Sequence, residues 1–130
     1  MSRLSGSWRS VAAWAVLILI ATTVPLTDVV IRAPVSWLDK LVHGVLYLVL
    51  GWLVGRELCA SGRRGVGAGM LALVALAVFA GLDEWHQRWL PGRVVSVGDW
   101  SADMAGATIG LAAAMIMWKA LRPPVPGSER

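Results

Sequence analysis

Apolar residues dominate four separate stretches of the chain, and polar residues gather between them. The stretches run from Val11 to Val24, Leu41 to Gly55, Val66 to Leu82 and Ala102 to Trp118. A helix needs about 20 predominantly apolar residues to cross the hydrocarbon layer of a membrane. The second and fourth stretches are shorter, so we expect the charged residues at their heads to occupy the first turns of longer helices. The pattern predicts an all-α protein, an integral membrane four-helix bundle.

Composition points to the same surroundings. Of the 130 residues, 57% are hydrophobic and 15% are charged, and the mean hydropathy is +0.65. A chain this short and this apolar cannot cover its own core with a polar surface in water. Membrane lipids are therefore its expected partners.

Basic residues are distributed unevenly between the two ends of the predicted helices. Eight of the twelve Lys and Arg lie at the end that holds both chain termini and the loop around Arg63. Cytoplasmic loops carry the excess of Lys and Arg, which predicts a multi-pass protein of the cell inner (plasma) membrane with both termini in the cytoplasm. The polar cluster then lies on the extracytoplasmic side. The net charge of +4 reflects topology and contact with anionic headgroups, and no nucleic-acid partner is expected.

The chain divides into one membrane domain and two short tails. Residues 1–10 are predicted to be a cytoplasmic basic tail, residues 11–120 a four-transmembrane-helix domain, and residues 121–130 a disordered, proline-containing tail. Arg3 and Arg9 precede an apolar run as in a signal peptide, but no convincing small-x-small cleavage site follows before Pro25. The first helix is therefore expected to remain in the protein.

A polar stretch from Asp83 to Gly106 interrupts the apolar sequence and holds four of the eight carboxylates. Ionisable groups inside a membrane are costly, and by default they mark functional sites. We expect this stretch and the head of the second helix to form one site. The candidate catalytic residues are His43, Asp39, Asp83, Glu84 and Asp103. The candidate binding residues are Arg93, Gln87, Asp99 and Lys40.

The second and fourth helices are predicted to open with the same S-x-x-D capping box, at residues 36–39 and 96–99. The serine oxygen accepts from early backbone N–H groups and the aspartate lies in the first turn, so capping is an alternative to a role in the site for both aspartates. His43 and Asp103 follow these aspartates by four positions, which places each pair on one helix face. Lys40 is expected either to reach the headgroup zone or to pair with an acid.

Asp83 and Glu84 are adjacent, so they cannot share one face of a helix, whereas Gln87 shares the face of Asp83. We expect Asp83 to point into the bundle and Glu84 to point toward the headgroups or toward Arg93. Arg93 follows the turn signal Pro91-Gly92. Its guanidinium is expected either to pair with one of the two acids or to bind an anion such as a phosphate.

Small residues recur at intervals of four in the last apolar stretch, at Ala102, Gly106 and Gly110. A stripe of this kind lets a second helix approach closely. Helix packing therefore accounts for it completely, and no binding role is assigned to these three residues.

The order and spacing of the polar motifs resemble the VanZ-like family over about residues 10 to 120. The matching residues are Asp39-Lys40-x-x-His43, Asp83-Glu84-x-x-Gln87, Pro91-Gly92-Arg93, and Ser96-x-x-Asp99 followed by Asp103-x-x-Gly106. The resemblance implies a small polytopic bacterial membrane protein. The family takes its name from a component associated with low-level resistance to teicoplanin. It implies no reaction. The family usually has asparagine where this chain has Asp103, which adds a titratable group near His43.

Three functions remain open. The predicted one is a VanZ-like protein that acts at the outer face of the bacterial inner membrane on or near a cell-envelope ligand, such as a lipid-linked cell-wall precursor or a glycopeptide. An alternative is a membrane enzyme acting on a lipid headgroup or lipid-linked precursor, with His43 and a carboxylate as acid and base or with a bound divalent metal. Another is a small proton-coupled exporter. No close ligand spacing such as H-E-x-x-H occurs, so neither a metal nor another cofactor is predicted.

Overall fold

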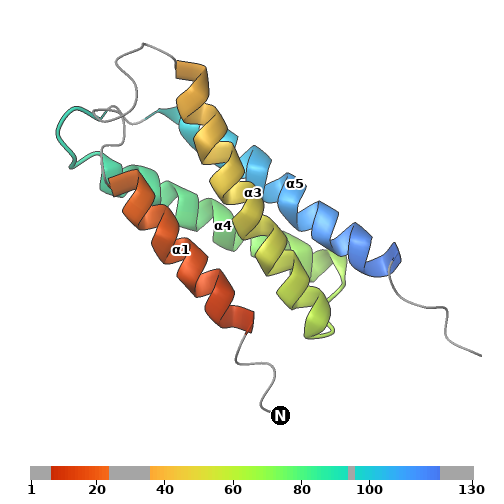
Figure 1. The fold of residues 1–130 in the computed structure, drawn as a ribbon. Coiled ribbons are helices and arrows are strands. Elements are labelled where there is room, and N and C mark those ends of the chain that lie inside the picture. The colour runs from red at the N-terminus through yellow and green to blue at the C-terminus, as the bar shows by residue number, and fades with distance from the viewer. Residues whose placement is uncertain (1–6, 24–35, 94–95, 121–130) are drawn as a thin grey trace, which may run out of the picture.

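The computed structural model describes residues 7–23, 36–93 and 96–120, which form four α-helices and no strand. The helices are α1 (Ser7–Thr23), α3 (Ser36–Ala60), α4 (Val66–Gln87) and α5 (Val97–Ala120), shown in Figure 1. The predicted all-α bundle is confirmed. Residues 7–10, expected as part of a basic tail, belong to α1, while the remainder of that tail and the predicted tail at 121–130 lie outside the described residues.

Three of these helices can span a membrane. The spans are Trp37–Ala60, Val66–Gln87 and Val97–Ala120, and the apolar part of α1, Trp8–Thr23, is shorter. At 1.5 Å per residue, the 17 residues of α1 lie at the lower limit for crossing a hydrocarbon layer about 30 Å thick. As expected, α3 and α5 extend beyond their uncharged stretches. The charged residues in their first two turns are Asp39, Lys40, Asp99 and Asp103.

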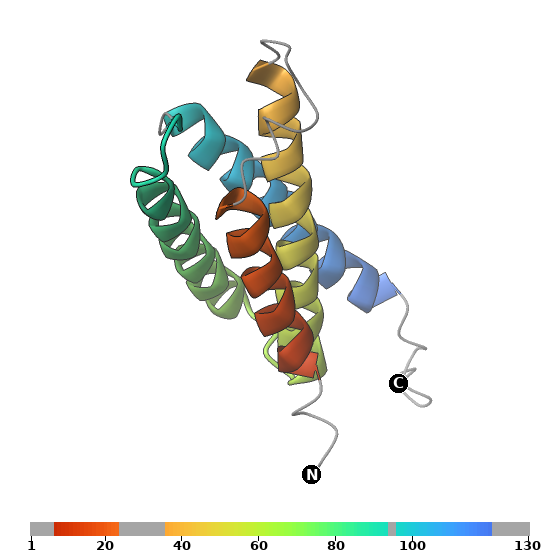
Figure 2. The same cartoon turned by 60° about the vertical axis from the view of Figure 1, so that its left-hand side comes forward.

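The helices run alternately in opposite directions, as Figures 1 and 2 show from two sides. The start of α1, the α3–α4 connection and the end of α5 lie at one end of the bundle, which we call the basic end because it carries Arg56, Arg63, Arg64 and Lys119. The ends of α1 and α4 and the starts of α3 and α5 lie at the opposite end, the polar end. Consequently α3 and α5 run in the same direction.

The α3–α5 crossing is made by glycines whose backbones touch. A Cβ atom on Gly106 would overlap the carbonyl oxygen of Gly44, and one on Gly110 would overlap that of Leu48. The predicted small-residue stripe on α5 therefore packs against α3, as expected for close helix approach in a membrane. Gly51 on α3 makes an equivalent contact with α5, which sequence inspection did not single out. This close approach brings the first turns of α3 and α5 side by side.

The outer surface of the bundle is apolar. Leu71, Ile116 and Ile20 are more than half exposed, as expected for side chains that face lipid. Inside, α1 is tied to α3 by Trp14, whose indole N–H donates to the carbonyl oxygen of Leu46 at 2.9 Å. Buried polar and charged side chains lie mainly toward the polar end, and these positions define the candidate site.

Candidate functional site

His43 and Asp103 meet in the interior between α3 and α5. The Nδ1 atom of His43 lies 3.0 Å from Oδ1 of Asp103, and the side chains are 2% and 0% exposed. Each stands one helical turn beyond the aspartate in the first turn of its own helix, and the glycine crossing brings the two helices together. The expectation that His43 faces the bundle close to Asp103, sixty positions away, agrees with this geometry.

Glu84 completes a cluster of three side chains from three helices. Its Oε1 atom lies 3.9 Å from Nδ1 of His43, and the candidate ligand atoms of His43, Glu84 and Asp103 all lie within 4.8 Å of one another. We call these three residues the histidine cluster. The sequence prediction that Glu84 points toward the headgroups or toward Arg93 is wrong, because the residue is 5% exposed.

The reason is the position of α4 in the bundle. Consecutive residues on a helix point about 100° apart, which follows from 3.6 residues per turn. On α4, Asp83 points toward α1 and α3, and Glu84 points toward the α3–α5 crossing. Both side chains therefore face protein. Which helices flank α4 is a property of the tertiary structure, and spacing along one helix does not contain it.

Asp83 belongs to a second, separate network. Its Oδ1 atom lies 2.8 Å from the Thr22 hydroxyl of α1, and its Oδ2 atom accepts from the Tyr47 hydroxyl of α3 at 3.3 Å. The Thr22 hydroxyl has one proton and also lies 2.9 Å from the carbonyl oxygen of Ile18 and 3.3 Å from that of Leu19, so three acceptors surround that proton. Asp83 is fully buried, and this network links α4 to α1 and α3.

Tyr47 and Thr22 were not among the predicted site residues. Tyr47 follows His43 by four positions on α3 and therefore continues its face, which is a signal that sequence inspection could have used. Thr22 carries no such signal. Its neighbour Thr23 has the same side chain in the same apolar helix, and only the direction of α1 relative to α4 distinguishes them.

An ion pair lies one turn closer to the polar end than the His43–Asp103 contact. The ammonium of Lys40 is 2.9 Å from Oδ1 of Asp99, and Lys40 is partly exposed whereas Asp99 is nearly buried. Of the two expectations for Lys40, pairing with an acid is therefore the one observed. Asp39 is partly buried and makes no hydrogen bond or ion pair with any described residue, so it does not join the histidine cluster.

Ser96 caps α5 as predicted. Its hydroxyl oxygen accepts from the backbone N–H of Gly98 at 3.1 Å, and its carbonyl oxygen accepts from that of Asp99 at 3.0 Å. These contacts satisfy early backbone donors of the helix, the usual role of an N-cap serine. The corresponding side chain at position 36 lies outside the described part of the chain.

Arg93 bonds to Gln87, not to either acid. Its guanidinium donates to Oε1 of Gln87, and neither expected pair with Asp83 or Glu84 is present among the described residues. An amide oxygen accepts a hydrogen bond but neutralises no charge. Arg93 therefore places an uncompensated positive charge at the polar end, where it can meet an anion.

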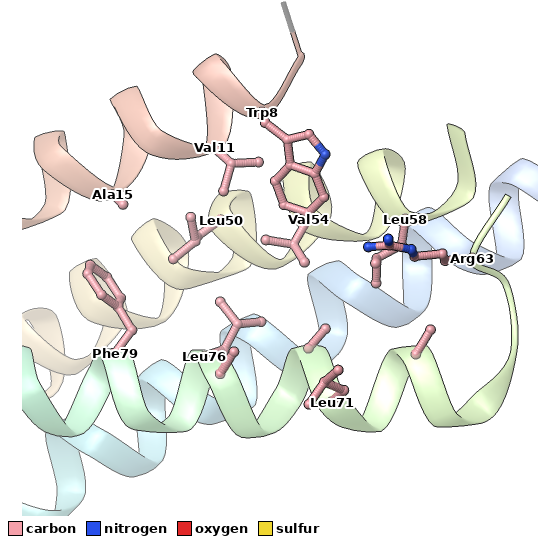
Figure 3. A pocket seen from close by; sticks show the side chains of 13 residues that line it. Trp8, Val11, Ala15, Leu50, Val54, Leu58, Arg63, Leu71, Leu76 and Phe79 are labelled. Atoms are coloured by element: carbon pink, nitrogen blue, oxygen red, sulfur yellow. The ribbon is translucent and has the colours of Figure 1, made fainter. Parts of the chain in front are cut away.

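An apolar cavity of about 400 Å³ lies apart from these polar groups, between α1, α3 and α4. Figure 3 shows Trp8 and Val11 of α1 and Phe79 of α4 around it, with Arg63 at the end nearest the basic end. Apart from Arg63 and the indole of Trp8, its lining is hydrocarbon. It therefore offers no groups for acid–base or metal chemistry.

The histidine cluster contains more negative charge than its own residues can balance. It has two carboxylates and one imidazole, and an imidazolium neutralises only one carboxylate. Among the described residues, Oε1 of Glu84 and Oδ2 of Asp103 are buried without a hydrogen-bond partner. An uncompensated charge in a low-dielectric interior costs several kcal/mol, roughly, even after relaxation. The cluster therefore requires a proton or a cation in addition to its own side chains.

Comparison with known proteins places the whole bundle in one family. The family model described as VanZ/LLP1 matches residues 4–118. This range includes the glycine crossing, every residue of the candidate site and all four helices apart from the last two residues of α5. No match was found among curated proteins or among solved structures. The chain therefore belongs to the VanZ/LLP1 family.

Proposed function

We propose that this protein acts at the outer face of the bacterial inner membrane, on or near an anionic cell-envelope ligand, and that it contributes to glycopeptide resistance. The observation that carries the proposal is the separation of the two bundle ends. Four of the five buried carboxylates among the described residues, together with His43 and the Lys40–Asp99 pair, collect toward one end, while the other end carries the basic loop and the fifth, Glu57, which pairs with Arg56. Membership of the VanZ/LLP1 family supports the link to glycopeptides, since the family's namesake is associated with teicoplanin resistance.

The orientation follows from charge. Arg63, Arg64 and Lys119 lie at the basic end, and the excess of basic residues stays on the cytoplasmic side of a membrane protein. This orientation puts both termini in the cytoplasm and the polar end outside. The polar end then faces the leaflet in which lipid-linked cell-wall precursors are used.

The ligand class follows from the cations at the polar end. Arg93 presents a guanidinium whose partner, Gln87, is neutral, and guanidinium groups bind carboxylates and phosphates through paired hydrogen bonds. Lys40 is already held by Asp99. We therefore assign the contact with a phosphate or carboxylate of the envelope ligand to Arg93.

Replacing Arg93 with alanine is expected to abolish most of the protein's protective effect against teicoplanin, because the anion contact is lost while the bundle is intact. The measurement is the minimal inhibitory concentration in matched cells that carry wild type, Arg93→Ala or no protein, with membrane abundance determined for each. Arg88→Ala is the control, since Arg88 is an exposed arginine at the same end of α4. Equal protection by Arg93→Ala and wild type at equal abundance would contradict the assignment.

A membrane enzyme acting on a lipid-linked precursor is the second candidate. Its support is the 3.0 Å contact between His43 and Asp103, since a carboxylate that orients an imidazole is the usual partner of a general base. The described residues offer no free nucleophile near it, because the hydroxyl of Ser101 donates to its own helix at Val97. Water would have to attack. The two functions differ in one observable, the turnover of a lipid-linked pyrophosphate by the purified protein.

A further inference from the structure

We propose that the histidine cluster binds one divalent transition-metal ion of the Zn²⁺ class. The ligands are Nδ1 of His43, Oε1 of Glu84 and a carboxylate oxygen of Asp103. The proposal goes beyond the envelope function and does not depend on it, because it rests on these three side chains alone. It differs from the sequence expectation of no metal, since the ligands come from three helices and no short motif contains them.

The distances within the cluster fit an ion. Two ligand atoms that each lie about 2.0–2.1 Å from a tetrahedral Zn²⁺ are separated by about 3.3 Å. The observed separations from Nδ1 of His43 are 3.0 Å to Asp103 and 3.9 Å to Glu84, on either side of that value. All three ligand atoms lie within 4.8 Å of one another, so the two carboxylates would move toward each other as they take up one ion. All three residues are at least nine-tenths buried.

One dication balances the charge of the cluster, whereas protons must occupy both the imidazole and one carboxyl group to do the same. With both carboxylates ionised and the imidazole neutral, the cluster carries two negative charges, which one divalent ion balances. Protonation of His43 would leave one negative charge in the interior of a membrane protein, where such charges are costly. Metal binding to Nδ1 requires the single imidazole proton to be on Nε2, so the ion replaces any proton between His43 and Asp103.

An independent observation also points to a ligand. Within the described part of the chain, Oε1 of Glu84 and Oδ2 of Asp103 are buried and accept no hydrogen bond. Buried polar atoms in proteins are nearly always satisfied, and an exception is commonly explained by an unseen water or ion. Both atoms belong to the two carboxylates of the cluster, and Glu84 presents its unsatisfied atom to His43.

The donor set selects the kind of metal. One imidazole nitrogen with two carboxylates suits Zn²⁺ and neighbouring first-row ions, whereas Ca²⁺ and Mg²⁺ prefer oxygen ligands alone. Three protein ligands leave one tetrahedral position for water or for an oxygen atom of a bound ligand. Catalytic zinc sites leave this position open, whereas structural sites fill it with a fourth side chain.

The test uses the full chain in detergent, purified through an affinity tag that contains no histidine, stripped with EDTA and titrated with Co²⁺ and then Zn²⁺. We expect one Co²⁺ per chain, a visible absorption spectrum of a four-coordinate site, and loss of that spectrum when Zn²⁺ displaces Co²⁺. His43→Ala and Glu84→Gln are each expected to weaken binding by at least about tenfold, since even outer-shell changes at metal sites cost about 10–100-fold.

The control variant is His86→Ala, which removes the exposed histidine of α4 and should change neither stoichiometry nor spectrum. Absence of Co²⁺ binding by wild type overturns the proposal. So does binding that survives Glu84→Gln but is lost in His86→Ala, because the ion then sits on the surface. If His43→Ala does not fold, the wild-type spectrum and the isosteric Glu84→Gln variant decide the matter. A negative result leaves the Arg93→Ala resistance experiment unaffected.

Discussion

Replacing Gly106 with leucine is expected to force α3 and α5 apart and to abolish the folded bundle. Even a single Cβ atom at this position would overlap the carbonyl oxygen of Gly44, and backbone cannot rotate away as a side chain can. Inserting extra atoms into a packed core usually costs about 1–3 kcal/mol of stability, because side chains shift to make room. A clash with backbone atoms, which cannot shift in this way, should cost more than roughly 3 kcal/mol. We expect aggregation on size-exclusion chromatography in detergent, or a melting temperature lowered by about 10 °C or more.

Gly67→Leu is the matched control for this substitution. Gly67 lies near the start of α4 and an added Cβ atom there meets nothing within 4 Å. Leucine is also the better helix former by roughly 0.5–1 kcal/mol. The control should therefore fold as well as wild type or better. Equal stability of the two variants would show that the α3–α5 backbone contact does not hold the bundle together.

Replacing His43 with alanine is expected to destabilise the protein by about 3–5 kcal/mol, because it leaves two buried carboxylates facing each other without their imidazole. The measurement that tests this reason is the energetic coupling between substitutions at His43 and Asp103. Adding Asp103→Asn to His43→Ala removes one of the stranded charges, so the double variant should be more stable than His43→Ala alone. The free energy of unfolding, measured in detergent with EDTA present, gives this comparison without any contribution from bound metal.

The control for the coupling experiment is again His86→Ala. This histidine is exposed, and exposed substitutions away from special contacts usually change stability by less than about 0.5 kcal/mol. If the effects of His43→Ala and Asp103→Asn simply add, the two side chains do not interact energetically. The 3.0 Å contact between them would then have no energetic role.

The helices and the polar faces that carry His43 and Asp103 were predictable from sequence because each depends on spacing along one helix. Four apolar stretches predict four helices. Each of the two capping boxes is followed, four positions after its aspartate, by a second polar residue, which predicts a polar face on each helix. The apolar run of the third stretch ends at Leu82, but the shared face of Asp83 and Gln87 implied a helix that continues beyond it, and α4 ends at Gln87.

The partners across helices could not be predicted in the same way. That Glu84 reaches the α3–α5 crossing, that Thr22 bonds to Asp83, and that Arg93 bonds to Gln87 all depend on the rotation and position of one helix relative to another. Sequence periodicity gives the face of a residue on its own helix but not which neighbour lies opposite. The metal hypothesis arises only from the three-dimensional arrangement for the same reason.

We place the proposed envelope function at the polar end of the bundle, which holds Arg93 and the histidine cluster, and not at the apolar cavity. Teicoplanin susceptibility of matched cells carrying wild type, His43→Ala or His86→Ala tests it most directly, with membrane abundance measured for each. One variant removes the buried histidine and the other the exposed one. Because His43→Ala is also expected to be less stable, its expression is raised until its membrane abundance equals that of wild type. We then expect His43→Ala to lose protection and His86→Ala to retain it, and full protection by His43→Ala would contradict this placement.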